Sequence, residues 1–287
     1  MQYKIFKIKS TSETIRKMAD QQGLILGEPL NLPLYFEQKL VAAGKIKLFL
    51  YDRQKYYISN SFLQKVSSSI DGLQEINDTE LFEIFAASAA NFNLALSKVI
   101  EFYITGYKSL FRIHITANQT HFLSCSFYKA YTHVFLCNGC ATAENFIKLC
   151  NASGISSKLS SDQKVVALSV LKSFVKNKIA ITAMSSNNNT LYISIALINQ
   201  LSQLFHEQGP ATVAEFSAIC KLASPNNQGA AHLLEEHLPI VSQVTLNRLV
   251  EAKEAKQVFL NKDPNSYSTL YISTKNQGNL QRVEISL

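Results

Sequence analysis

A unit of helix, strand, turn and strand that recurs along the chain constrains the fold more than any other sequence feature. In its clearest copy, 166–194, apolar residues three or four positions apart predict a helix, and two β-rich segments around a polar turn predict a hairpin. Further copies lie at 35–59, 96–124 and 245–273. When the copies are aligned, one position of the last strand recurs at separations of 65, 70 and 79 residues, as Ile58, Leu123, Ile193 and Ile272. Such a long period predicts a tandem array.

Two further helices are expected before each complete unit. A hydroxyl or acidic residue with a nearby Glu caps free N–H groups at a helix start, which predicts caps at Asp78, Thr142 and Thr212. Apolar runs upstream predict first helices at 62–70, 127–135 and 195–205. The first copy has a segment like the capped helix at 12–18 and a possible strand at 3–8, but no room for a full first helix.

The resulting order of helix, capped helix, helix and hairpin resembles the winged helix-turn-helix family. The local sequence at 209–216, GPATVAEF, resembles the tandem winged-helix part at the C-terminus of the selenocysteine-specific elongation factor, although a GxxxxGK[ST] loop for a GTPase is absent from the sequence. The resemblance implies a helix-rich α+β fold of four modules: 1–61, 62–126, 127–194 and 195–287, the last with an extra helix at 230–238. It also implies that third helices enter a major groove while hairpins, or wings, reach the adjacent backbone.

Composition sets the outer limits of function. The 287 residues are 47% hydrophobic, enough for sizeable cores, and the net charge of +7 favours acidic partners. The sequence contains neither an 18-residue apolar run nor a secretion signal, so we expect no membrane partner. Five cysteines, an odd number, indicate reduced thiols and a cytoplasmic location.

Basic residues recur on the predicted third helices and wings, where the resembled family docks on nucleic acid. Lysine and arginine bind phosphates and dominate affinity for DNA or RNA. We therefore predict binding of DNA or structured RNA through modules 1, 3 and 4, at Lys39, Lys45, Lys47, Arg53, Lys55, Lys164, Lys172, Lys176, Lys178, Arg248, Lys253, Lys256 and Lys262.

Reading of base edges has fewer candidates. Arg, Asn and Gln usually serve this role, and Gln38 and Arg248 are the main ones here. The third helix of module 2 offers mainly apolar groups, including Phe102 and Tyr103. An alternative function is therefore a protein-interaction scaffold in which third helices contact partners.

The cysteines offer weaker alternatives. Cys137 and Cys140 form a C-x-x-C, but a second pair for zinc is missing from the sequence, so we predict neither metal nor cofactor. Cys140 at an expected helix start, with His206 or His237 as base, would be needed for a cysteine enzyme. We favour buried structural thiols and a protein without catalytic activity.

The hairpins make a further prediction about packing. Alternation on their first strands should turn one set of side chains toward small local cores, one core in each module. This set is Ile46, Leu48, Ile179, Ile181, Val258 and Leu260. The alternative is one sheet built from all four hairpins.

Overall fold

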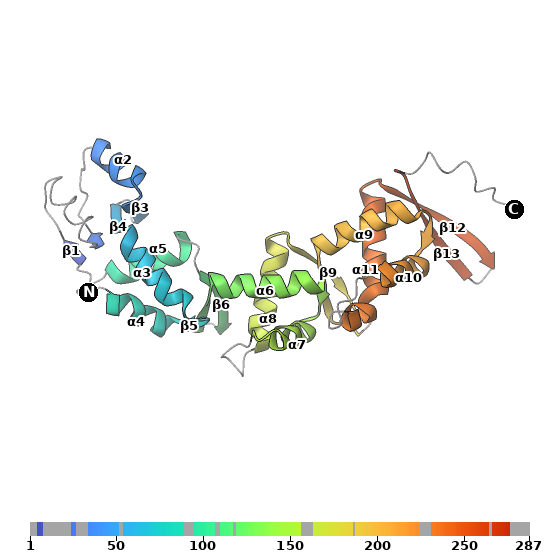
Figure 1. Cartoon of the computed structure of the whole chain (residues 1–287), viewed down its shortest axis with the longest axis horizontal. Helices are drawn as coiled ribbons and strands as arrows, with labels where there is room; N and C mark the ends of the chain where they lie inside the picture. Colours follow the sequence, from blue (N-terminus) through green and yellow to red (C-terminus); the bar gives the residue numbers. More distant parts are fainter. Residues whose placement is uncertain are drawn as a thin grey trace. The chain divides into compact units, whose positions relative to one another are not determined.

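The protein is a helix-rich α+β structure with small sheets (Figure 1), so the predicted fold class is confirmed at this level. The computed structural model describes residues 5–7, 24–26, 34–51, 54–88, 95–106, 110–116, 119–155, 163–185, 187–223, 231–263 and 266–275. Strands within these ranges form four separate sheets, each containing one hairpin. They do not form the single sheet that the alternative required.

The chain divides into two compact units, Met1–Lys129 and Ala130–Leu287. Unit 1 contains modules 1 and 2, and unit 2 contains nearly all of module 3 together with module 4. The division falls within helix α6 (Cys125–Asn138).

The described elements of modules 2, 3 and 4 follow one order: helix, short strand, helix, helix, and two strands that form the hairpin. The first set is α3 (Asn60–Asp71), β5 (Glu75–Asn77), α4 (Asp78–Ser88), α5 (Ala95–Gly106), β6 (Leu110–Thr116) and β7 (Gln119–Ser124). The second is α6, β8 (Cys140–Ala141), α7 (Ala143–Ala152), α8 (Gln163–Lys176), β9 (Ala180–Met184) and β10 (Thr190–Ser194). The third is α9 (Ile195–Gln208), β11 (Ala211–Thr212), α10 (Val213–Ala223), α11 (Ala231–Glu251), β12 (Ala255–Asp263) and β13 (Ser266–Ser273).

The three sheets also share one strand order. In each, the short strand pairs antiparallel with the last strand of the hairpin, giving the orders β5-β7-β6, β8-β10-β9 and β11-β13-β12. The backbone therefore repeats the same topology three times, which is a stronger regularity than the few shared residues of the sequence.

Module 1 contains β1 (Ile5–Lys7), β2 (Leu24–Leu26), α2 (Leu34–Ala42), β3 (Ile46–Tyr51) and β4 (Gln54–Ser59). Its sheet has the order β1-β2-β4-β3, with β1 and β2 parallel. Strand β1 falls within the strand predicted at 3–8, whereas the helical segment predicted at 12–18 lies outside the described residues.

The hairpins of modules 2 and 3 pass directly into the next helix through a capping serine. The backbone N–H of Phe127 donates to Ser124 Oγ at 3.3 Å, and that of Leu197 donates to Ser194 Oγ at 3.1 Å. A side-chain oxygen at this position satisfies an N–H that has no partner within the helix. The serine that ends the last strand thus fixes where the following helix begins.

Two of the predicted caps of the second helices are confirmed. Thr142 Oγ1 accepts from the N–H of Asn145 at 3.3 Å. Thr212 and Glu215 form a reciprocal capping box, in which Glu215 N donates to Thr212 Oγ1 at 3.3 Å and Thr212 N donates to Glu215 Oε2 at 2.8 Å.

The predicted cap at Asp78 is wrong. Asn77 occupies this role, because its Oδ1 accepts from Glu80 N at 2.8 Å and its own N–H donates to Glu80 Oε2 at 2.9 Å. The amide of asparagine caps as well as a carboxylate does, so the sequence alone offered both adjacent residues for this role.

In unit 1, one buried cluster joins the end of module 1 to module 2. Ile58 on β4 is fully buried against the helices of module 2. Phe85 packs edge-on against both Phe62 and Tyr103, at centroid distances of 6.1 and 5.2 Å. The last strand of one module therefore belongs to the core of the next.

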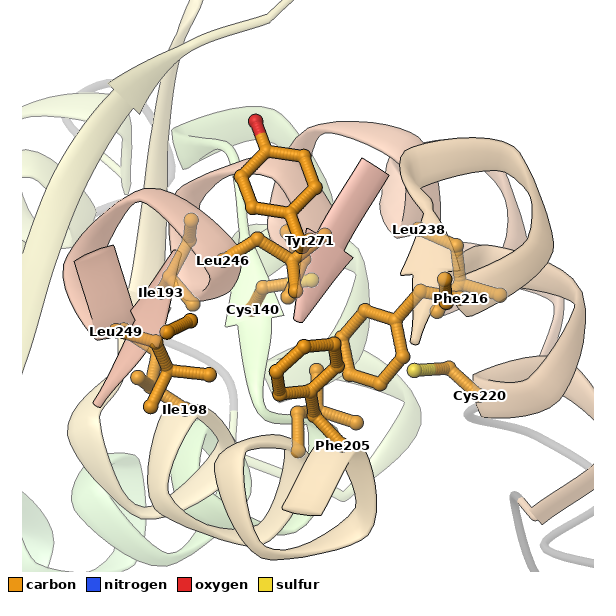
Figure 2. Packing of buried hydrophobic residues seen from close by; sticks show 14 of the residues in the cluster. Cys140, Ile193, Ile198, Phe205, Phe216, Cys220, Leu238, Leu246, Leu249 and Tyr271 are labelled. Carbon is orange, nitrogen blue, oxygen red and sulfur yellow. The ribbon is translucent and has the colours of Figure 1, made fainter. Parts of the chain in front are cut away.

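In unit 2, a larger buried cluster joins module 3 to module 4. Cys140 and Ile193 of module 3 lie in one buried cluster with Phe205, Phe216 and Tyr271 of module 4 (Figure 2). The rings of Phe205 and Phe216 meet edge to face at 5.5 Å. Modules 3 and 4 therefore share apolar surface, as neighbouring modules of a tandem array do.

The extra helix predicted at 230–238 is not a separate element. Residues 231–251 form the single helix α11, with Pro239 in its interior. The expected helix ended directly before Pro239, a residue that lacks a backbone donor, but the helix continues through it. The extension packs on module 3, because the buried His237 lies 3.4 Å from Asn145 Nδ2.

The hairpin prediction holds only in part. Ile46 is buried at 1% exposed, and Leu48, Ile179 and Ile181 are half-buried. Val258 is 38% exposed, contrary to expectation, although its partner Leu270 also pairs with Thr212 of β11. The side chain of Leu260 lies outside the described residues.

Within the described residues we find no helix that is both long and apolar enough to span a bilayer.

Candidate nucleic-acid interface

Helix α8 combines a deeply buried face with a basic one. Its buried residues are Val166, Ala167, Val170, Leu171, Ser173 and Phe174. Lys164, Lys172 and Lys176 are exposed, and the half-buried Leu168 completes their row. Residues four apart are neighbours on a helix surface, so the three ammonium groups follow one stripe about 18 Å long.

The surroundings of this stripe contain few negative charges. From residue 163 to residue 206 the sequence has four Lys and neither Asp nor Glu. Lys164 Nζ lies 3.4 Å from Glu144 Oε1 on α7, but both side chains are about two-thirds exposed, where such pairs are weak. Lys172 and Lys176 have no ion-pair partner in the described part of the chain. The face of α8 is therefore positive and available to an acidic ligand.

The hairpin of module 3 ends in an exposed amide cluster that sequence reasoning had treated only as a turn. Asn187, Asn188 and Asn189 are all exposed, and the turn is closed by Ser185 N donating to the carbonyl of Asn189 at 2.8 Å. Asn189 N also donates to Ser185 Oγ at 3.1 Å. Such a preformed tip can offer donors and acceptors without further ordering. The run of three Asn was the available signal.

Module 4 places its basic residues differently. Arg248, Lys253 and Lys256 are exposed as predicted, but α11 also carries three Glu, at 235, 236 and 251. The third helix of module 4 is therefore net acidic, unlike α8. The side chain of Lys262 lies outside the described residues.

Module 1 presents exposed Lys39, Lys45 and Lys47 around the end of α2 and the start of β3. Arg53 and the side chain of Lys55 lie outside the described residues. The base-reading candidates Gln38 and Arg248 are both exposed.

Module 2 differs from the scaffold expectation. Tyr103 is fully buried, with its hydroxyl 2.8 Å from Ser67 Oγ, and Phe102 packs against the same core. These residues are not an apolar docking surface, because the 3.6-residue period of α5 turns them toward α3 and α4.

The surroundings of the cysteines do not favour a catalytic thiol at Cys140. All five cysteines are free thiols. Cys140 lies in strand β8 rather than at a helix start, since α7 begins at Ala143 after the cap Thr142. Burial raises the pKa of Cys140 to about 12 and also that of Cys150 to about 12. A thiol in such surroundings is a poor nucleophile.

Cys137 is the exposed thiol of the C-x-x-C, and its Sγ lies 3.6 Å from His133 Nε2 one helical turn away. Two ligands do not make a zinc site, and the described residues contain no group of three or more candidate metal ligands.

His206 belongs to a polar cluster at the base of the last hairpin. Its Nδ1 lies 2.7 Å from Ser273 Oγ and its Nε2 lies 3.0 Å from Glu254 Oε2, which also binds Lys275 Nζ at 2.6 Å. A serine, a histidine and a carboxylate in this order resemble a hydrolytic triad, but Ser273 is only 2% exposed and cannot reach a substrate. The cluster instead ties α9 to the ends of β13 and α11.

The sequence matches no protein-family model and has no significant match among curated proteins.

Proposed function

We propose that the protein is an array of winged-helix modules that binds nucleic acid through the phosphate backbone, chiefly with module 3. The order of three helices and a hairpin, with the short strand paired to the last strand, supports the winged-helix assignment of modules 2, 3 and 4. The observation that carries the function is the lysine stripe of α8, which lies in a stretch of sequence, 163–206, without Asp or Glu.

The chemistry of this face favours backbone contact over base reading. Lysine is a point charge that suits phosphate, whereas bidentate recognition of base edges uses Arg, Asn or Gln. The exposed and half-buried side chains along α8 are mainly Lys, Leu, Val and Ser. We therefore propose binding with little sequence preference, by a non-catalytic protein located in the reducing cytoplasm, where five free thiols persist.

The test is a charge reversal on α8. Lys172→Glu with Lys176→Glu should weaken binding to duplex DNA or structured RNA and flatten the salt dependence, by about 0.9 in the slope of log K against log salt for each lost duplex-DNA contact. The fold should remain, because both side chains are exposed. Titrations of the full chain by fluorescence anisotropy at 0.05 and 0.15 M salt measure both quantities.

The matched control is Lys65→Glu with Lys129→Glu, which changes net charge equally on the first helices α3 and α6. The control variant should retain most of the affinity. Equal losses in both variants, or no binding of either nucleic acid by the wild type at micromolar concentration, would overturn the proposal.

A protein-interaction scaffold remains the second candidate, because large apolar groups are exposed elsewhere. Leu222 on α10 is 88% exposed and Phe259 on β12 is 71% exposed. Single exposed apolar residues are common, so this observation carries less weight than the basic stripe. Partner binding that survives the α8 reversal but is lost on Leu222→Ser or Phe259→Ser favours the scaffold.

A further inference from the structure

The junction between third helix and hairpin has the same backbone geometry in modules 1, 3 and 4. Gly44, Lys178 and Lys253 occupy one position in this junction, with φ of 65°, 57° and 60°. In module 3, Lys178 N donates to the carbonyl of Val175 at 3.0 Å, and the next N–H donates to the carbonyl of Phe174 at 2.8 Å. Module 4 repeats these bonds, Lys253 N to Val250 O at 3.0 Å and the next N–H to Leu249 O at 2.7 Å. This is the Schellman arrangement that ends many helices.

A lysine at this position is unexpected on conformational grounds. Positive φ brings Cβ close to the following carbonyl, so the position usually holds glycine, as it does at Gly44, or asparagine. Among the described residues other than glycine, only three have positive φ: Lys178, Lys253 and Asn188. Two of these three residues are therefore lysines, and they lie at equivalent positions of successive modules. If lysine were merely tolerated in left-handed backbone, the two would not be expected at the same position.

Local contacts do not explain the lysines either. Both are exposed, and neither has an ion-pair partner among the described residues. A cation near a helix C-terminus is favourable through the helix dipole, but Lys176 already supplies that charge in the last turn of α8 with ordinary helical backbone. A lysine at the strained position 178 therefore gives the helix dipole no interaction that Lys176 does not already give.

We propose that Lys178 and Lys253 are equivalent phosphate contacts, retained at the helix–hairpin junction despite the conformational strain, so that one nucleic acid contacts modules 3 and 4 together. This inference rests on the proposed function and extends it, because the α8 stripe concerns module 3 alone. The shared core of the two modules supports a common ligand, since it holds both junctions within one compact unit.

The experiment compares glycine and arginine at each junction in the full chain. Lys178→Gly removes strain and charge together, so the melting temperature should rise by about 2 °C while affinity for duplex DNA falls. One lost phosphate contact with a salt slope of 0.9 corresponds to about fivefold in affinity at 0.15 M salt. Lys253→Gly should behave alike with a smaller loss of affinity, because Glu251 and Glu254 lie beside it in sequence. Arginine at either position keeps the charge and should keep the affinity.

Lys178→Met is the control that separates charge from strain, because it removes the charge and keeps a β-carbon at positive φ. It should lose affinity as Lys178→Gly does, without the rise in melting temperature. If Lys178→Gly leaves affinity and slope unchanged while the α8 reversal lowers them, the inference fails and the proposed function stands. If only Lys253→Gly has no effect, the ligand does not reach module 4 and the two-module contact is refuted. Absence of wild-type binding instead refutes the proposed function itself.

Discussion

Substitution of Gly139 tests how tightly modules 3 and 4 are joined. Gly139 is buried between α6 and β8 and has φ of +75°. Its N–H donates to the carbonyl of Phe135 at 2.9 Å, and its own carbonyl accepts from Ser194 N at 2.7 Å. A Cβ at this position would lie 2.8 Å from Leu197 Cδ2 and 3.3 Å from Leu197 Cγ, and Leu197 belongs to the first helix of module 4.

The expected loss of stability for Gly139→Ala has two parts. Left-handed backbone disfavours alanine by about 1 to 2 kcal/mol. Overpacking adds about 1 to 3 kcal/mol, because the added Cβ would press on Leu197, which packs against the shared core. We therefore expect the free energy of unfolding to fall by about 2 to 5 kcal/mol.

Gly154→Ala is the matched control, since Gly154 has nearly the same φ, +73°, and an added Cβ would meet nothing within 4 Å. Gly154→Ala should lower the free energy of unfolding only by the about 1 to 2 kcal/mol that left-handed backbone costs alanine. Urea titrations followed by far-ultraviolet circular dichroism give both values. A second test is Gly139→Ala in a Leu197→Ala background, where the clashing atoms are gone and the loss should shrink to the control value. If Gly139→Ala costs no more than Gly154→Ala, the steric coupling between the modules is absent and the argument is wrong.

Three other predictions follow from buried or paired polar groups. Replacing Cys137 and Cys140 together by serine should lower stability by about 1 to 2 kcal/mol, arising at the buried Cys140, and leave nucleic-acid affinity unchanged; loss of bound metal or of a hydrolytic activity would contradict this. The hydrogen bond from Lys275 holds the pKa of Glu254 below its ordinary 4.5, so its contribution is present at neutral pH and lost as pH falls below that value. Glu254→Gln should therefore flatten the acid limb of the pH–stability curve, and an unchanged limb would refute the pairing. The buried carboxylate of Glu75 has no hydrogen-bond partner in the described structure, so Glu75→Met should raise the urea midpoint, and a lower midpoint would indicate a missing partner.

Local patterns in the sequence were sufficient for the elements whose signals are local. The apolar spacing of α8 and the alternation of β9 and β10 identify the clearest unit, because each period is set by the geometry of its own backbone. The caps Thr142 and Thr212 follow from the same logic. The exposure of Lys172 and Lys176 could also be predicted, since it follows from the helical face opposite Leu171 and Phe174.

Predictions failed where distant residues decide the outcome. The scaffold alternative placed Phe102 and Tyr103 on an apolar surface. Instead Tyr103 is fully buried, and Phe102 packs, partly buried, against the same core. Arg248 lies on a helix that the sequence divided in two, and the full length of α11 includes three glutamates that make it acidic. Lys253 and Lys256 were also predicted on this helix, whereas Lys253 lies in the turn after α11 and Lys256 lies on β12.

The sequence by itself determined the helix-rich α+β class, the recurring unit and the lysine face of α8, because these depend on periods and charges within a few turns of chain. Only the tertiary structure decided that the three complete copies share one strand order. It further decided that Cys140 is a buried strand residue and that modules 3 and 4 share one hydrophobic core. It also decided that two lysines occupy left-handed backbone at equivalent junctions. The physical reason is the range of the interactions. Strand pairing and burial join residues that are distant in sequence, such as Ala211 and Tyr271, and no local pattern encodes which distant partner a residue will meet.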